Sequence, residues 1–190
     1  MNLFLIIIVI IFLLVIFLPT GETEYQEKDK GNRLNKYASK GCNFDNKMDT
    51  SLYTFAIDKN NEKLLILSAV PTNRQNELLL NFEDIIGFEV NKNGETITKA
   101  SLGAPIAGGM LFGVGGMLLG SILGNRKSKE KLTVDIIIQL NSFDNPIVKI
   151  PIVKSSDLEI TQKKNLEVLD KLCVWFKLIL EKNESKKQPV

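Results

Sequence analysis

The sequence predicts an α+β protein with an N-terminal transmembrane helix, an antiparallel β-domain of about seven strands and a C-terminal amphipathic helix. Three observations support this prediction. Residues 3–18 (LFLIIIVIIFLLVIFL) carry no polar side chain. Between residues 51 and 153, short runs of Leu, Ile, Val and Phe alternate with turn residues about every ten positions, which is typical of antiparallel sheet. Beyond residue 160, apolar residues recur at steps of three and four, the period of a helix.

The apolar segment predicts an uncleaved membrane anchor over residues 1–20. At about 1.5 Å per residue it spans about 24 Å, slightly less than a hydrocarbon core of about 30 Å, and its flanks can lie in the interface. A cleaved signal peptide is the main alternative. It is disfavoured because no Lys or Arg precedes the run and no small-residue cleavage site follows it. A buried core helix would need a polar face, which this segment lacks.

The basic residues near the anchor predict its orientation. None precedes it, and five follow it within twenty residues: Lys28, Lys30, Arg33, Lys36 and Lys40. The positive-inside rule therefore places the amino terminus outside and the main domain in the cytoplasm. The expected localisation is the cell membrane, with a single pass.

The anchor is followed by an expected polar linker over residues 21–50 and by a β-domain over residues 51–183. The sequence Asn93-Gly94 is a strong signal for a two-residue hairpin turn, because both positions accept positive φ. The predicted strands are residues 52–57, 63–70, 77–80, 85–92, 95–99, 132–140 and 147–153.

A helix is predicted over residues 161–182, followed by a tail at 184–190. Its apolar stripe consists of Leu166, Leu169, Cys173, Phe176 and Leu180. On this stripe Cys173 is expected to be a buried structural thiol. About seven strands followed by one helix is the order of elements in a pleckstrin-homology-like (PH-like) barrel or sandwich, in which the helix plugs an open end. This similarity of order and length implies nothing about function.

A glycine-rich apolar insert (LGAPIAGGMLFGVGGMLLGSILG, residues 102–124) interrupts the strand pattern. Small residues four apart form a flat helical stripe on which another backbone can pack closely. Each glycine weakens a helix in water by roughly 1 kcal/mol relative to Ala, so an apolar environment must compensate. The expected packing face for membrane contact or self-association is Gly109, Gly113, Gly116, Gly120 and Gly124.

Three interpretations of residues 102–124 compete. The favoured one is a hairpin of two short helices, each about 15 Å long, whose ends return together as a connection between neighbouring antiparallel strands requires. A single transmembrane helix of about 33 Å is long enough, but one crossing would separate the strands on either side of the insert. The third is an apolar loop packed on the domain.

A basic cluster follows the insert and is expected to lie on anionic lipid headgroups. A solvated basic loop is the alternative. The glycines do not form a nucleotide-binding loop, because the GK[ST] ending is missing. The cluster consists of Arg126, Lys127, Lys129 and Lys131.

The run FEDIIGFEVNKNGETITK, the glycine-rich insert, the basic stretch and KLTVDIIIQLNSFDNPIVKIPIV occur in this order over residues 81–153. In this order they resemble a family of uncharacterised Firmicute and phage proteins with a glycine-rich insert in a PH-like β-domain. The resemblance implies the fold but no binding or catalytic residue. This chain departs from the family in its amino-terminal anchor and in lacking a recognisable zinc ribbon.

The composition argues against an enzyme, a cofactor or metal site, and nucleic-acid binding. The chain has no histidine, two cysteines far apart in sequence and a formal net charge of +2. The acidic pairs Glu83-Asp84 and Asp157/Glu159 lie at predicted turns without a partner base.

The expected function is therefore that of a non-enzymatic, membrane-anchored binding or scaffold protein. Its glycine-rich hairpin would contact membrane lipid or a second copy of the chain, and any further protein partner is unknown. The alternative is a transport or channel component with two transmembrane helices.

Overall fold

The computed structural model describes residues 21–69, 77–103 and 132–187. The chain divides into two compact units, Met1–Lys40 and Gly41–Val190. The predicted transmembrane anchor, residues 1–20, lies outside the described residues. Within the described ranges, no helix is both long enough and apolar enough to cross a bilayer.

The first unit contains helix α2, Gly21–Ala38, within the segment expected to be a polar linker. This helix was not predicted. The segment is rich in Glu, Gln, Lys and Arg, which are good helix formers. Ion pairs one turn apart join Lys30 Nζ to Glu27 Oε1 at 3.0 Å and Arg33 NH1 to Asp29 Oδ2 at 3.5 Å. The helix has few apolar residues, so a search for apolar periodicity does not detect it.

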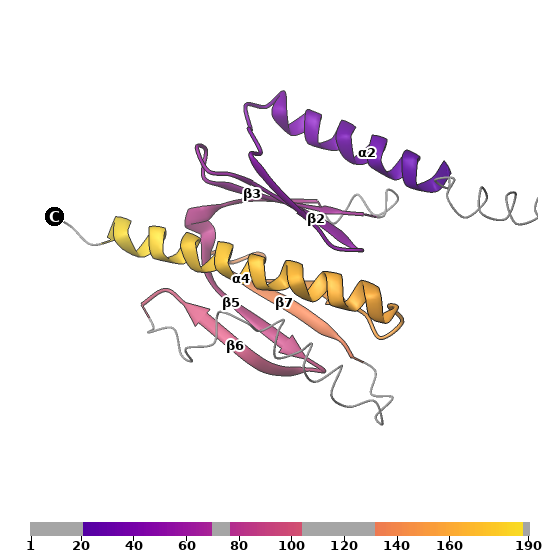
Figure 1. Ribbon diagram of the computed structural model, residues 1–190. Coiled ribbons are helices and arrows are strands. Elements are labelled where there is room, and N and C mark those ends of the chain that lie inside the picture. The colour runs from indigo at the N-terminus through magenta and orange to yellow at the C-terminus, as the bar shows by residue number, and fades with distance from the viewer. Residues whose placement is uncertain (1–20, 70–76, 104–131, 188–190) are drawn as a thin grey trace, which may run out of the picture. The chain divides into compact units, whose positions relative to one another are not determined.

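In its described residues, the second unit contains two four-stranded antiparallel sheets and a long C-terminal helix (Figure 1). The first sheet has the order β1-β2-β3-β4 and contains β1 Asn46–Asp49, β2 Tyr53–Asp58, β3 Lys63–Ser68 and β4 Leu78–Asn81. A 3₁₀ turn, η2 Phe82–Asp84, leads into the second sheet, whose order is β6-β5-β7-β8. Its members are β5 Ile85–Lys92, β6 Glu95–Ser101, β7 Val134–Leu140 and β8 Ile147–Val153, and helix α4 Glu159–Lys187 follows.

The predicted strands and helix are confirmed, with small differences at their ends. The bounds of β5 and β8 are those predicted, and the Asn93-Gly94 turn joins β5 to β6, with positive φ at both residues. The polar strand β1 falls in the expected linker and was not predicted. Helix α4 is longer than the predicted 161–182.

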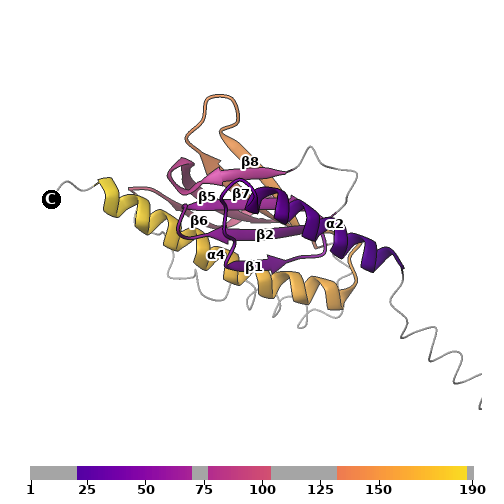
Figure 2. The same cartoon turned by 90° about the horizontal axis from the view of Figure 1, so that it is seen from above.

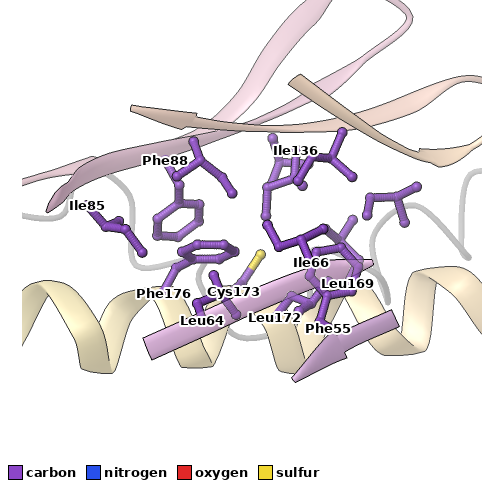
Figure 3. Packing of buried hydrophobic residues seen from close by; sticks show 14 of the residues in the cluster. Phe55, Leu64, Ile66, Ile85, Phe88, Ile136, Leu169, Leu172, Cys173 and Phe176 are labelled. Atoms are coloured by element: carbon purple, nitrogen blue, oxygen red, sulfur yellow. The ribbon is translucent and has the colours of Figure 1, made fainter. Parts of the chain in front are cut away.

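One hydrophobic core joins both sheets and α4. Helix α4 packs along the strands, in contact with β1, β5, β8 and η2 (Figures 1 and 2). Figure 3 shows side chains from β2, β3, β5, β7 and α4 meeting between the layers. The rings of Phe88 and Phe176 lie 5.4 Å apart at their centroids. The helix residues in this core include the whole predicted stripe: Leu166, Leu169, Cys173, Phe176 and Leu180.

Cys173 is the buried thiol that the sequence predicts. Its side chain is 0% exposed and lies in the core beside Leu172 and Phe176 of the same helix (Figure 3). Burial, together with the charge of Asp170, raises the pKa of the Cys173 thiol to about 12. A thiol with so high a pKa remains protonated at neutral pH and is a poor nucleophile.

Two buried asparagines hold α4 at its two ends, about five turns apart on the same side of the helix. Near the amino end, the fully buried Asn165 donates to Ile152 O at 2.8 Å and Ser51 Oγ at 2.9 Å, and it accepts from Ser51 N at 3.0 Å. Near the carboxyl end, Asn183 Nδ2 donates to Phe82 O at 2.7 Å and Ile85 O at 3.0 Å. Each amide therefore ties α4 to backbone groups of other elements, Asn165 to Ser51 and Ile152, and Asn183 to Phe82 and Ile85.

Gly87 lies in the middle of the second sheet, where β5 has β6 on one side and β7 on the other. A Cβ at this position would lie 2.5 Å from Gln139 Oε1, 2.9 Å from Ala100 O and 3.2 Å from Ser101 Cβ. The Gln139 side chain is flexible, but the Ala100 carbonyl belongs to the neighbouring strand. The sheet therefore requires glycine at this position.

Replacing Gly87 with Ala is expected to lower the free energy of unfolding by about 1–3 kcal/mol, because the new methyl group must displace the backbone of β6. Urea unfolding followed by circular dichroism measures this change. Gly31→Ala is the control, since no atom lies within 4 Å of a Cβ built there, and it should be neutral or slightly stabilising in its helix. Equal stability of Gly87→Ala and the parent protein would contradict this account of Gly87.

Candidate functional site

The expected functional residues lie in a segment outside the described residues, but both places where that segment joins the domain are described. The glycines Gly109, Gly113, Gly116, Gly120 and Gly124 and the basic cluster Arg126, Lys127, Lys129 and Lys131 all fall within residues 104–131. The chain leaves the sheet after Ser101, at what we call the departure end. It returns at Leu132 and Val134, at what we call the return end.

The strand order fixes how far apart these two ends lie. Both β6 and β7 pair antiparallel with β5, one on each side, so β6 and β7 are parallel to each other. Ser101 pairs with Gly87, whereas Val134 pairs with Lys92. At about 3.3 Å per residue, these two positions lie about 17 Å apart along β5. The segment therefore connects opposite ends of the sheet.

This strand order differs from the one that a returning hairpin would need. The hairpin interpretation assumed that the insert joins neighbouring antiparallel strands and returns to its starting point. The strands it joins are instead parallel and separated by β5, and such strands need a crossover connection. The topology also opposes a single membrane crossing, because that would place Ser101 and Val134 on opposite sides of the bilayer although both belong to one sheet.

At the departure end, the backbone is fixed by α4 and β5. Leu102 N donates to Ile86 O at 2.8 Å. Gly103, with φ of +74°, donates its N–H to Glu184 Oε1 at 2.9 Å. Glu184 directly follows Asn183, which is itself bonded to η2 and β5. The carboxyl end of α4 therefore helps to hold the chain in place just before the glycine-rich segment.

The turn between β2 and β3 holds the same end of α4. Glu62 lies in this turn with φ of +54° and forms ion pairs with Lys182 Nζ at 3.0 Å and with Lys186 Nζ. The hydrogen bonds from Lys186 and Lys182 keep the pKa of Glu62 below its ordinary value of 4.5. Partly exposed pairs of this kind contribute little stability singly, so their main effect is to orient the end of α4.

The buried Asp58 side chain stabilises the β2–β3 turn by accepting hydrogen bonds. Its carboxylate is 0% exposed and accepts hydrogen bonds from the N–H groups of Asn43, Asn60 and Asn61 and from Asn61 Nδ2, at 2.6–3.1 Å. Burial alone would raise the pKa of Asp58. The hydrogen bonds from Asn61, Asn43 and Asn60 outweigh burial, and the pKa lies below its ordinary value of 3.8.

The return end is fixed by the β5–β6 turn. Thr133 N donates to Asn93 Oδ1 at 2.9 Å, and Asn93 N donates to Thr133 O at 2.9 Å. Leu132 is buried in the core. The Asn93-Gly94 turn, which the sequence predicts as a hairpin, therefore also holds Thr133, just after the segment.

Exposed apolar side chains gather at both ends. At the departure end, the β7–β8 turn carries Phe143, which is fully exposed, and β8 begins with Ile147, which is 63% exposed. This turn joins η2 through a hydrogen bond from Asn141 N to Asp84 O at 2.8 Å. At the return end, Leu158 is 73% exposed and Ile160 78% exposed. Sequence reasoning missed these residues because their exposure depends on the fold.

In each acidic pair of the sequence, the aspartate accepts a hydrogen bond within the fold. Asp84 Oδ2 accepts from Asn81 Nδ2 at 3.0 Å, and Asp157 Oδ2 accepts from Lys154 N at 2.8 Å. Glu83 and Glu159 are exposed. Among the described residues, no group of three or more Cys, Asp or Glu side chains is arranged to hold a metal ion.

Lowering the pH should weaken the fold through Asp58. Because its folded pKa is lower than its unfolded pKa, its contribution is complete above about pH 4 and is lost as the pH falls further. Asp58→Asn should lower the free energy of unfolding at pH 7 by about 1–3 kcal/mol and reduce the acid dependence. Urea unfolding between neutral and acidic pH measures both effects. Asp144→Asn, in the exposed β7–β8 turn, is the control; an identical pH profile for Asp58→Asn and the parent would refute this role.

The shared sheet predicts that both sides of the insert face the same compartment. Asn60→Cys and Asn141→Cys each place a thiol at an exposed position of the second unit. In sealed membrane vesicles, both should react with an impermeant maleimide from the same side. The parent protein gives the background, which should be low because Cys42 and Cys173 are buried. Labelling from opposite sides would support two transmembrane helices.

More than half of the chain matches a known protein family. Residues 39–154 match the profile of a family described as a glycine zipper containing PH domain. The match includes all eight strands and the glycine-rich segment and ends before α4. Neither a search of curated proteins nor a search of solved structures found a match. Because the profile covers more than half of the chain, the protein belongs to the family of PH domains that contain a glycine zipper.

Proposed function

We propose that this protein is a non-enzymatic scaffold held at the cell membrane, whose PH-like domain binds lipid or protein and whose glycine-rich segment packs against lipid or a second copy. The single observation that carries the proposal is the family match, which joins a PH domain to a glycine zipper. PH domains commonly bind lipids or proteins. The apolar residues 3–18 supply the membrane anchor in this proposal, and the domain lies on the cytoplasmic side.

The described fold supports a scaffold in two ways. The core is continuous through both sheets and α4, so the domain is a rigid support for a segment attached to it. Both ends of that segment are held by hydrogen bonds, from Gly103 to Glu184 and between Thr133 and Asn93. In the proposed function, Gly109, Gly113, Gly116, Gly120 and Gly124 form the packing face. The headgroup contacts come from Arg126, Lys127, Lys129 and Lys131.

The proposal is tested by enlarging two glycines in the full-length chain. Gly116→Leu with Gly120→Leu should weaken self-association in mild detergent by tenfold or more, because two bulky side chains prevent close backbone contact. Gly116→Ala with Gly120→Ala keeps both positions small and should stay within about twofold of the parent. Analytical ultracentrifugation over a range of protein concentrations measures the association.

The same preparations separate packing from anchoring. Residues 1–20 are unchanged in all variants, so each should remain in the membrane fraction after carbonate washing. Unchanged self-association in the Leu variant would refute the packing role of the glycines. Release of the parent protein by carbonate would refute the anchor.

A further inference from the structure

The start of α4 presents two large apolar side chains to solvent on a well-ordered turn. Leu158 and Ile160 are 73% and 78% exposed. Lys154 N donates to Asp157 Oδ2 at 2.8 Å, and Asp157 N donates to Lys154 O at 3.0 Å. Gln162 N donates to Leu158 O at 2.9 Å, and Gln162 Nε2 donates to Asp157 O at 3.0 Å. Because these bonds fix the backbone, both side chains are held outward.

Three lysines lie within six residues of these two side chains in sequence. Ile160, Lys163 and Lys164 are spaced three and four residues apart in α4 and therefore share one face of the helix. All three are exposed, as is Lys154 before the helix. The carboxylate of Asp157 is used in the turn, and Glu159 is the other acidic residue in this stretch. We call Lys154, Leu158, Ile160, Lys163 and Lys164 the α4 corner.

The α4 corner lies at the return end of the second sheet. Val153, the last residue of β8, pairs with Val134, the first residue of β7. The chain therefore returns from the glycine-rich segment beside the strand that leads into the corner. In sequence, the residues just before Leu132 are the predicted headgroup-binding run. Apolar side chains beside several lysines suit the interface of a bilayer that contains anionic lipid.

The exposed apolar residues Phe143 and Leu178 lack this combination. Phe143, at the departure end, is followed by Asp144, and its turn is bonded to η2, which contains Glu83 and Asp84. Anionic lipid would be repelled there. Leu178, 56% exposed near the other end of α4, lies beside the ion pair of Lys177 and Glu181 at 3.6 Å. Charge complementarity therefore favours the α4 corner.

We propose that the α4 corner is the surface by which the domain docks on an anionic bilayer. Leu158 and Ile160 enter the interfacial region, and Lys154, Lys163 and Lys164 lie among the headgroups. The proposal rests on the membrane location given above under the proposed function, and it adds which face of the domain meets the lipid. It orients α4 with its amino end toward the membrane.

The test places an environment-sensitive fluorophore on the full-length protein in lipid vesicles. Single variants Leu158→Cys, Ile160→Cys, Phe143→Cys and Leu178→Cys are labelled with a nitrobenzoxadiazole group. The last two are matched controls, because they replace exposed apolar residues elsewhere on the same unit. The parent protein controls for the buried Cys42 and Cys173. The vesicles contain phosphatidylcholine with or without phosphatidylserine and a lipid-borne quencher.

The labels at 158 and 160 should be quenched at least twofold more than those at 143 and 178 in vesicles with phosphatidylserine, and much less without it. Lys163→Glu with Lys164→Glu should abolish this difference, whereas Lys171→Glu, an exposed lysine farther along α4, should leave it. Equal quenching at all four positions, stronger quenching at 143, or no dependence on phosphatidylserine would overturn the proposal.

Failure of this inference can be distinguished from failure of the proposed function. Flotation of the same vesicles shows whether the full-length protein is membrane-bound. If it floats with the vesicles but the labels at 158 and 160 remain unquenched, the docking surface alone is wrong. If the protein does not float, the membrane scaffold and the docking surface are both wrong.

Discussion

The central position of β5 is the constraint on which the rest of the second unit depends. It pairs with β6 on one side and β7 on the other, and it supplies Phe88 to the contact with Phe176 of α4. Because β6 and β7 are both antiparallel to β5, the chain between them must cross from one end of the sheet to the other. The absence of a side chain at Gly87 permits the close approach of the strands on both sides.

Helix α4 connects the core to the departure end of this crossover. Its apolar stripe fills the space between the sheets, while Asn165 and Asn183 bond backbone groups at either end of the helix. Near its carboxyl end, Lys182 and Lys186 pair with Glu62 of the β2–β3 turn, and Glu184 accepts a hydrogen bond from Gly103 N. Packing and polar contacts therefore combine in one element, and the same helix that completes the core positions the start of the glycine-rich segment.

Local pattern was sufficient to predict most of the strands and α4. The apolar run in residues 85–92, the Asn93-Gly94 turn and the three- and four-residue steps from Leu166 to Leu180 each identify an element without help from the rest of the chain. Helix α2 and strand β1 were missed because both are polar, and apolar periodicity is then weak. The family match supports the predicted PH-like domain with its glycine-rich insert.

The pairing of distant strands could not be predicted in this way. Nothing in the sequence near Ser101 or Val134 shows that β5 lies between them, since the order of strands depends on long-range contacts. The roles of Asn183 and Glu62 depend on the same contacts, because each bonds to residues far away in sequence. The exposure of Leu158, just before α4, and of Ile160, in its first turn, depends on how the rest of the unit packs around them.

The distance between the two ends of the crossover has a consequence for the length of the chain between them. A gap of about 17 Å between parallel strands can be closed by a connection of about a dozen residues. Residues 102–133 are far more numerous than that. The fold alone therefore does not account for the length of this stretch. Its surplus residues are open to selection for a purpose other than completing the sheet.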